Sequence, residues 1–115
     1  MIDGMNTAVP GAWLVRTMGC DPQEIEYLRR EGELFARPDG SGDWLYPAWQ
    51  FGPGGKVPRA VRTVVRAARD AGMNEARLAV VLARRVGLSG QRRLRDLLWE
   101  GDGEFVAEQV RAAAA

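Results

Sequence analysis

Short apolar segments separated by glycine and proline divide the chain into predicted elements. Residues 12–19 hold enough apolar side chains for two turns of helix, which end at a glycine. Asp21 and Pro22 then mark a new helix start, because aspartate caps a helix and proline favours its first position. Ile25 and Leu28 share one face of this second helix, which we expect to end near residue 30.

A hairpin and a boundary follow the second predicted helix. Residues 34–37 and 43–46 have the composition of short strands, and the PDGSG sequence between them is typical of a hairpin turn. Pro47 ends the second strand. Residues 52–58, with the sequence GPGGKVP, are rich in glycine and proline and form the strongest internal boundary.

From residue 59 onward the hydrophobic pattern has the period of a helix. Valine and alanine recur on one face of residues 59–71, and leucine and valine do so in the segments that follow. Glycines mark the ends of these segments, and Asn74 and Asp102 are caps for two of them. The pattern predicts four helices, over residues 59–71, 73–87, around 94–98 and 102–115.

The sequence therefore predicts a mainly α fold, in which a helix-turn-helix with a short β-hairpin wing packs on a C-terminal four-helix unit. Neither half carries many large apolar residues, so we expect the two halves to share a core. The predicted divisions are a flexible tail (1–10), a winged helix-turn-helix-like unit (11–51), a linker (52–58) and a helical partner-binding unit (59–115).

Composition limits the location and the chemistry of this protein. Of its 115 residues, 46% are hydrophobic, which is typical of a globular protein. No apolar run approaches the ~18 residues that cross a membrane, and the N-terminus does not resemble a secretory signal. We therefore expect a cytoplasmic protein with no membrane partner.

The absence of histidine argues against catalysis and metal binding. The chain has no histidine and one cysteine, Cys20. A cysteine nucleophile needs a base beside it, and histidine is the commonest base and metal ligand. No pair of carboxylates stands out by spacing. We expect Cys20 to be a buried apolar residue, and we expect no enzyme activity, no metal and no cofactor.

Charges are segregated along the chain, although the net charge is only +1. Residues 21–33 and 96–115 are acidic, whereas residues 56–95 hold one lysine and ten arginines against two acidic residues. Local fields then matter more than net charge. Four arginines share one stripe of the predicted helix 59–71: Arg59, Arg62, Arg66 and Arg69.

Three interpretations of this arginine stripe remain open. It is a solvated helix face, an interface with an acidic protein, or a surface that contacts phosphate. In the third interpretation the stripe belongs to a larger basic patch that includes Arg84, Arg85, Arg92 and Arg93.

The segment DWLYPAWQF concentrates aromatic residues between the two predicted halves. Its rings are Trp44, Tyr46, Trp49 and Phe51. One hypothesis is a surface on which nucleic-acid bases stack. The other, which we favour, is an inter-lobe pin that buries its large rings to join the hairpin to the helical unit.

Helix, turn, second helix and hairpin are, in this order, the parts of a winged helix-turn-helix, and the arrangement resembles its MerR-like form. In such units the second helix enters the major groove of DNA. The residues suited to contact DNA are Gln23, Arg29, Arg30, Arg37 and Lys56. The second helix also carries several carboxylates, which oppose phosphate binding, so the alternative is a scaffold or a dimerisation unit.

Two motifs carry a resemblance to a known family. Tyr46, Pro47, Ala48, Gln50 and Phe51 match its "YPAxQF" segment, and Asp96, Leu98, Gly101 and Asp102 match its closing "PLDxLxxGD" stretch, in which Leu94 and Arg95 replace the proline and leucine. The chain resembles antitoxins of the Xre/MbcA/ParS type, in the branch with a small N-terminal helix-turn-helix. This branch is similar to small mycobacterial winged-helix DNA-binding regulators.

The resemblance implies an antitoxin-like function. The C-terminal helical half would bind a RES-type toxin, which degrades NAD, and the N-terminal half would bind operator double-stranded DNA. The alternatives are a standalone winged-helix transcriptional regulator and a structural protein-interaction module without DNA binding. A homodimer is compatible with each of these functions.

Overall fold

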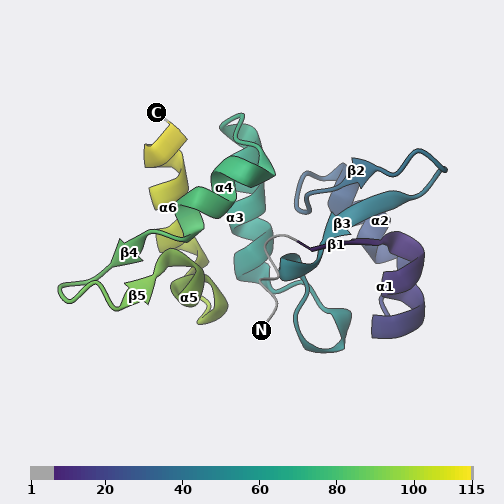
Figure 1. The fold of residues 1–115 in the computed structure, drawn as a ribbon, viewed down its shortest axis with the longest axis horizontal. Helices are drawn as coiled ribbons and strands as arrows, with labels where there is room; N and C mark the ends of the chain where they lie inside the picture. The colour runs from purple at the N-terminus through teal and green to yellow at the C-terminus, as the bar shows by residue number, and fades with distance from the viewer. Residues whose placement is uncertain (1–6, 115) are drawn as a thin grey trace. The chain divides into compact units, whose positions relative to one another are not determined.

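The chain folds into two compact units, Met1–Pro58 and Arg59–Ala115 (Figure 1). The structure is a computed structural model that describes residues 7–114. The boundary between the units falls where the predicted linker ends. Within residues 7–114, six α-helices and two small antiparallel sheets make the fold mainly α, as the sequence predicts.

The first unit combines two helices with a three-stranded sheet. Its elements are β1 (Ala8–Pro10), α1 (Gly11–Met18), α2 (Pro22–Arg30), β2 (Arg37–Pro38), β3 (Trp44–Pro47) and two 3-10 turns (Ala48–Gln50 and Pro53–Gly55). All strand pairs are antiparallel, in the order β1-β3-β2. The flexible tail predicted for residues 1–10 is therefore wrong for residues 8–10, because β1 pairs with β3. Residues 1–6 lie outside the described residues.

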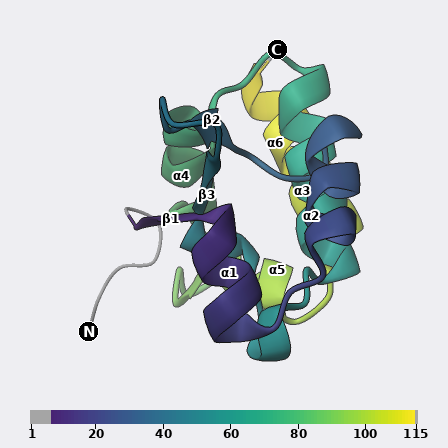
Figure 2. The same cartoon turned by 90° about the vertical axis from the view of Figure 1, so that its right-hand side faces the viewer.

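A tight turn connects α1 and α2 (Figure 2). Gly19 ends α1 in the left-handed conformation with φ 72°, which glycine adopts without steric cost. The carboxylate of Asp21 accepts a hydrogen bond of 2.9 Å from the backbone N–H of Gln23, and Pro22 is the first residue of α2. The predicted helix start at Asp21 and Pro22 is confirmed.

The core of the first unit forms between the two helices and the sheet. It includes Leu14 from α1, Ile25 and Leu28 from α2, and Tyr46 from β3. Val57 packs against this core, and the 3-10 turn Pro53–Gly55 lies against α1. The segment predicted as a linker therefore belongs in large part to the first unit.

The second unit contains four helices and a β-hairpin. Its elements are α3 (Arg59–Asp70), α4 (Glu75–Leu82), β4 (Arg85–Val86), β5 (Arg92–Arg93), α5 (Leu94–Trp99) and α6 (Gly103–Ala114). In both ribbon views α3 runs beside α6, and Gly103 permits this approach because a Cβ there would lie 2.8 Å from the Cα of Ala60. The buried side chains include Val64, Leu82 and Val106.

The predicted helix over residues 73–87 is wrong beyond Leu82. Residues 85–93 instead form an antiparallel hairpin, in which Arg85 pairs with Arg93. Gly87 and Gly90 both have positive φ, so the loop between the strands uses a conformation that a helix excludes. The predicted cap at Asn74 is confirmed, because its side chain accepts a hydrogen bond of 2.8 Å from the backbone N–H of Arg77.

No helix within residues 7–114 is both long and apolar enough to cross a bilayer.

Candidate nucleic-acid interface

The second helix of the first unit presents a polar face to solvent. Ile25 and Leu28 are buried, whereas Gln23, Tyr27 and Arg30 are exposed. Spacings of four and three residues place these three side chains on one stripe of α2. Tyr27 is 61% exposed, which is unusual for a large ring, and the sequence pattern predicted no role for it beyond flanking the core. We refer to Gln23, Tyr27 and Arg30 as the α2 stripe.

Arg29, which the sequence predicts to contact DNA, packs against the wing. Its guanidinium carbon lies 4.1 Å from the centroid of the Trp44 ring, in cation–π geometry. Its Nη2 also lies 3.6 Å from the carboxylate of Glu26, and only 19% of its side chain is exposed. The spacing of Arg29 within α2 did not reveal this contact, because Trp44 lies on a different element.

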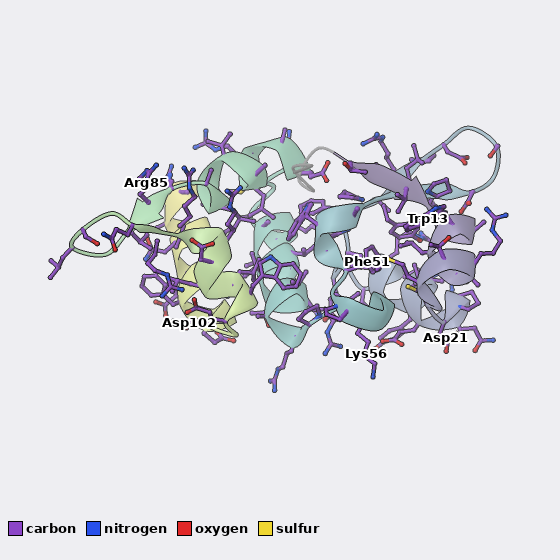
Figure 3. The ribbon with its side chains drawn as sticks, turned by 60° about the horizontal axis from the view of Figure 1, so that its bottom comes forward. Trp13, Asp21, Phe51, Lys56, Arg85 and Asp102 are labelled. Carbon is purple, nitrogen blue, oxygen red and sulfur yellow. The ribbon has the colours of Figure 1, made fainter. Side chains whose placement is uncertain are left out.

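The other predicted DNA-contacting residues reach solvent. Gln23 and Arg30 lie on α2, Arg37 is in β2, and Lys56 points outward from the loop after the turn Pro53–Gly55 (Figure 3). Arg30 already has one partner, because its Nη2 donates a hydrogen bond of 2.7 Å to the carboxylate of Glu26. This exposed ion pair is weak and can exchange for another anion.

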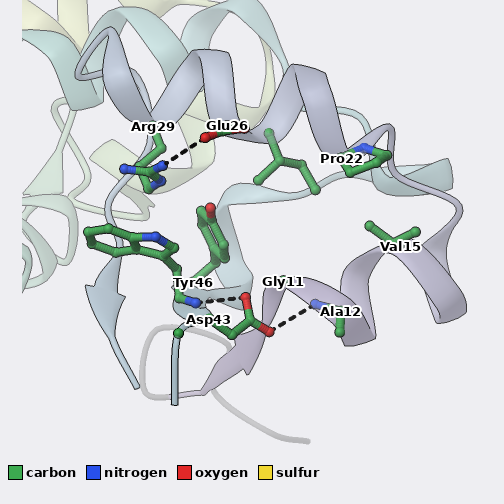
Figure 4. Close-up of a pocket in the computed structure, with 11 residues that line it drawn as sticks. Gly11, Ala12, Val15, Pro22, Glu26, Arg29, Asp43 and Tyr46 are labelled. Atoms are coloured by element: carbon green, nitrogen blue, oxygen red, sulfur yellow. Dashed lines mark hydrogen bonds and ion pairs between the residues drawn. The ribbon is translucent and has the colours of Figure 1, made fainter. Parts of the chain in front are cut away.

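A cavity of about 390 Å³ lies where α1, α2 and β3 meet (Figure 4). Most of its polar groups have partners, whereas the buried Nε of Arg29 has none among the described residues. Asp43 accepts hydrogen bonds from the backbone N–H of Ala12 at 3.2 Å and from that of Trp44 at 2.7 Å, and Arg29 faces Glu26 and Trp44. Burial raises the pKa of Tyr46, which also lines the cavity. These contacts join the wing to both helices and leave few groups to bind a ligand.

The tip of the β2–β3 wing is acidic. Asp39 accepts hydrogen bonds from the backbone N–H and the hydroxyl of Ser41 and from the backbone N–H of Asp43. The hydrogen bonds from Ser41 lower the pKa of Asp39 and keep it ionised. The same bonds form the predicted hairpin turn, so the residues that shape this wing also make its tip unfavourable for phosphate.

The aromatic segment supplies core residues to the first unit. Tyr46 and Phe51 belong to its core and meet edge to face, with ring centroids 6.3 Å apart. Trp49 is buried, and Trp44 is half-buried beneath Arg29. Because so little of these rings is exposed, a surface for base stacking is not favoured here. The predicted contact of this segment with the helical unit stays a prediction.

The glutamine of the segment YPAWQF has a buried side-chain amide with a structural role. The Gln50 side chain is fully buried, its Oε1 accepts a hydrogen bond of 2.6 Å from the N–H of Phe35, and its Nε2 donates to the carbonyls of Phe35 and Pro47, each at 3.1 Å. The Gln50 side chain thus makes the two backbone hydrogen bonds that a neighbouring strand would otherwise make with Phe35. The strand predicted over residues 34–37 is therefore confined to its end, where β2 begins at Arg37.

The arginine stripe is present on α3, but its members differ in environment. Arg59, Arg66 and Arg69 are exposed, whereas Arg62 is half-buried. The Nε of Arg62 is buried and has no hydrogen-bond partner among the described residues. Arg62 is therefore less accessible to a partner than the other three.

A second concentration of arginine lies on the β4–β5 hairpin. Five arginines occur between residues 83 and 95, namely Arg84, Arg85, Arg92, Arg93 and Arg95. The sequence placed four of them in a basic patch but expected a helix. The two glycines around Leu88 and Ser89 were the signal that could have predicted the hairpin.

Cys20 is buried, as expected, and its thiol donates a hydrogen bond of 3.2 Å to the carbonyl of Gly55. Desolvation, with a further contribution from the negative charge of Glu24, raises the pKa of this thiol. Cys20 is therefore poorly suited to act as a nucleophile. Within residues 7–114, no group of three or more acidic or thiol side chains converges on a point that could hold a metal ion.

Comparisons with known proteins identify the fold but not a family. No protein-family model matches this chain, and no curated protein is significantly similar to it. The chain is similar to the NMR structure of Rv2175c, with a TM-score of 0.64 and 19% sequence identity. The similarity covers 100% of this chain and 86% of that one. At this identity the similarity concerns the fold alone.

Proposed function

We propose that this protein binds double-stranded DNA and that its first unit reads the base sequence. The observation that carries the proposal is the arrangement of α1, a tight turn, α2 and the β2–β3 wing, with a polar stripe on the outer face of α2. In winged helix-turn-helix units the second helix of this arrangement enters the major groove. Such a function places the protein in the cytoplasm.

The α2 stripe has suitable chemistry for this role. Gln23 lies in the first turn of α2, the part of a recognition helix that contacts base edges, and glutamine pairs with adenine through two hydrogen bonds. Tyr27 can donate to a phosphate, and Arg30 can exchange Glu26 for a phosphate or for guanine. The joint between Arg29 and Trp44 would hold the wing in a constant orientation relative to α2.

The test begins with selection of bound sites from a random duplex library, using the full chain at low salt. Affinity for a selected site and for an unrelated duplex is then measured by fluorescence anisotropy. The double variant Gln23→Ala/Tyr27→Ala should lose discrimination between the two duplexes, because each base contact contributes about 1–3 kcal/mol. Gln109→Ala, on α6, removes an amide outside the first unit and should leave discrimination unchanged.

Absence of DNA binding at low salt would contradict the proposal. Equal discrimination by the wild type and by the α2 double variant would exclude α2 as the reading helix. Sedimentation analysis adds the oligomeric state, since a homodimer would select two half-sites about 34 Å apart.

A second candidate is the antitoxin-like function, in which the C-terminal helical half binds a RES-type toxin. Two large aromatic side chains near the turn between α5 and α6 favour a protein partner. Trp99 is 45% exposed and Phe105 is 38% exposed, and exposed aromatic residues commonly anchor protein interfaces. Asp96, Leu98 and Gly101, which match the family motif, lie on α5 and at its end.

This second candidate has a separate test. The tagged full chain is used to isolate a partner from nuclease-treated lysate of the source organism, and the partner is assayed for NAD degradation. An antitoxin would form a stoichiometric complex and inhibit that activity, and Trp99→Ala/Phe105→Ala would weaken both effects. A partner without NAD-degrading activity would contradict the toxin assignment.

A further inference from the structure

The first unit supplies few of the cations that DNA binding requires. Residues 1–58 contain five basic and eight acidic side chains, a formal charge of −3. Residues 59–115 contain eleven basic and seven acidic side chains, a formal charge of +4. Neutralisation of phosphate by lysine and arginine supplies a large share of DNA affinity. The second unit therefore carries most of the side chains that can neutralise phosphate.

The β4–β5 hairpin has the highest positive charge density in the described residues. Residues 83–95 hold five arginines and no acidic residue. In Figure 1 the loop between β4 and β5 projects beyond the helices of its own unit, and Figure 3 labels Arg85 on this hairpin. Arg84, Arg85 and Arg92 are exposed, so the hairpin presents positive charge on a narrow arm that can enter a groove.

The pairing of the two strands opposes charges of the same sign. Arg85 is directly opposite Arg93, and Val86 is opposite Arg92. Like charges directly opposite one another destabilise an antiparallel pair. Local rules of this kind are commonly broken at functional sites. A polyanion would relieve the repulsion between Arg85 and Arg93.

Contacts within the hairpin orient the arginines but neutralise little of their charge. Arg85 donates to the carbonyl of Gly90 at 3.2 Å, and Arg93 donates to the carbonyl of Ala83 at 3.0 Å. The single ion pair in this group joins Arg92 to Glu100, among the described residues. The side chains of Arg84 and Arg95 make no hydrogen bond or ion pair within residues 7–114.

The tip of the hairpin carries one large apolar side chain. Leu88 is fully exposed in the loop, between Gly87 and Ser89. An isolated exposed leucine is not informative by itself, but this one lies at the end of an arginine-rich arm. Proteins that enter the minor groove of DNA commonly insert leucine or another apolar wedge at a base step. Arginine also favours the negative potential of a narrow minor groove.

We propose that the β4–β5 hairpin is a DNA-binding arm, in which Arg84 and Arg85, together with Arg95 at the start of α5, contact backbone phosphates and Leu88 enters the minor groove. The proposal rests on the DNA binding proposed above and assigns the phosphate contacts to the second unit. It accounts for an acidic first unit, because affinity and sequence reading are then provided by different units.

The experiment measures the affinity of the full chain for a selected duplex between about 50 and 200 mM salt. The variant Arg84→Gln/Arg85→Gln should lose affinity by about tenfold to a hundredfold, and the slope of log K against log salt should fall by about two. Leu88→Ser should weaken binding with the slope unchanged. The control Arg77→Gln/Arg111→Gln removes the same charge from exposed positions of α4 and α6 and should leave both values close to wild type.

Four outcomes decide the proposal, and thermal melting of each variant verifies that it is folded. If the slope of log K against log salt is unchanged in Arg84→Gln/Arg85→Gln, the proposal that the hairpin binds DNA is wrong, even if the α2 double variant still loses discrimination between the two duplexes. An equal decrease in the control pair would show a general charge effect and would also overturn it. A decrease only in Arg59→Gln/Arg69→Gln would assign phosphate contact to α3 instead. If the wild type binds no DNA and the hairpin binds an acidic protein, both the arm and the DNA-binding function are wrong.

Discussion

Arg29 lies over the ring of Trp44, with 4.1 Å between its guanidinium carbon and the ring centroid, and this contact ties α2 to the wing. The two residues are on different elements, so the contact depends on the folding of the whole first unit. Glu26 approaches the same guanidinium from α2 and leaves it only 19% exposed. Arg29 thus has the position of a structural joint within a candidate DNA-reading unit.

Replacement of Arg29 should destabilise the first unit. Arg29→Ala removes a partly desolvated cation–π contact, which contributes about 1–2 kcal/mol, and exposes one face of Trp44. Arg30→Ala is the matched control, because Arg30 also pairs with Glu26 but is 68% exposed. The control should cost less than about 1 kcal/mol. Urea unfolding followed by tryptophan fluorescence measures both, and equal losses would contradict the structural role of Arg29.

Replacement of Gln50 should lower the free energy of unfolding more than replacement of Arg29. Gln50→Ala leaves the buried N–H and carbonyl of Phe35 without their side-chain partner, and each unsatisfied group costs about 1–3 kcal/mol. We expect a loss of about 3 kcal/mol in the free energy of unfolding. Gln109→Ala, on the half-exposed side of α6, should change it by less than about 0.5 kcal/mol. A loss below about 1 kcal/mol for Gln50→Ala would mean that water replaces the amide.

Alanine substitutions at the adjacent Gly54 and Gly55 distinguish the cost of backbone strain from the cost of steric crowding. Gly54 and Gly55 have φ of 71° and 74°, so an alanine at either position pays a similar conformational cost. A Cβ at Gly54 would meet nothing within 4 Å, whereas one at Gly55 would lie 2.5 Å from the Sγ of Cys20. Gly55→Ala should therefore be about 1–3 kcal/mol less stable than Gly54→Ala. Identical denaturation midpoints would show that the turn moves freely away from α1.

Alkylation of Cys20 should require a higher pH in the folded protein than in the unfolded protein. Its pKa is raised in the folded protein by desolvation and by Glu24, and only the thiolate reacts with iodoacetamide. Alkylation followed by mass spectrometry should therefore rise at higher pH in the native protein than in urea, where the thiol ionises near pH 8.5. Glu24→Gln should move the native profile back toward lower pH. Superimposable native and urea profiles would contradict the raised pKa.

The same raised pKa has a consequence for stability. Above the unfolded pKa the unfolded chain releases the Cys20 proton while the folded chain retains it. Unfolding then becomes more favourable as pH rises, until the folded pKa is passed. The difference in stability between the wild type and Cys20→Ser should therefore shrink between neutral and alkaline pH.

The helices α3 and α6 should separate when Gly103 acquires a side chain. A Cβ at this position would lie 2.8 Å from the Cα of Ala60, which is backbone and cannot rotate away. Gly103→Ala should lower the free energy of unfolding of the second unit by about 1–3 kcal/mol, despite the better helix propensity of alanine. Glu104→Ala, at the next and exposed position, serves as the control. A stabilised Gly103→Ala protein would mean that the helices adjust at no cost.

Sequence patterns identified the elements of this protein more reliably than its contacts. The start of α2 and the cap of α4 were predicted because Asp21 and Asn74 bond to backbone groups two or three residues away. The hairpin at residues 85–93 was missed because its glycines follow a run that also satisfies the helical period. Among the candidate DNA residues, exposure agrees with the prediction for Gln23 and Arg30 but not for Arg29.

The sequence by itself determined the mainly α architecture, the turn between α1 and α2, the hairpin turn of the β2–β3 wing and the concentration of arginine near residues 84–95. These features depend on dihedral preferences and hydrogen bonds between near neighbours, which local sequence specifies. Tertiary structure decided that Gln50 bonds to Phe35, fifteen residues away, and that Trp44 covers Arg29. Such contacts join distant segments, and their geometry depends on how a whole core packs.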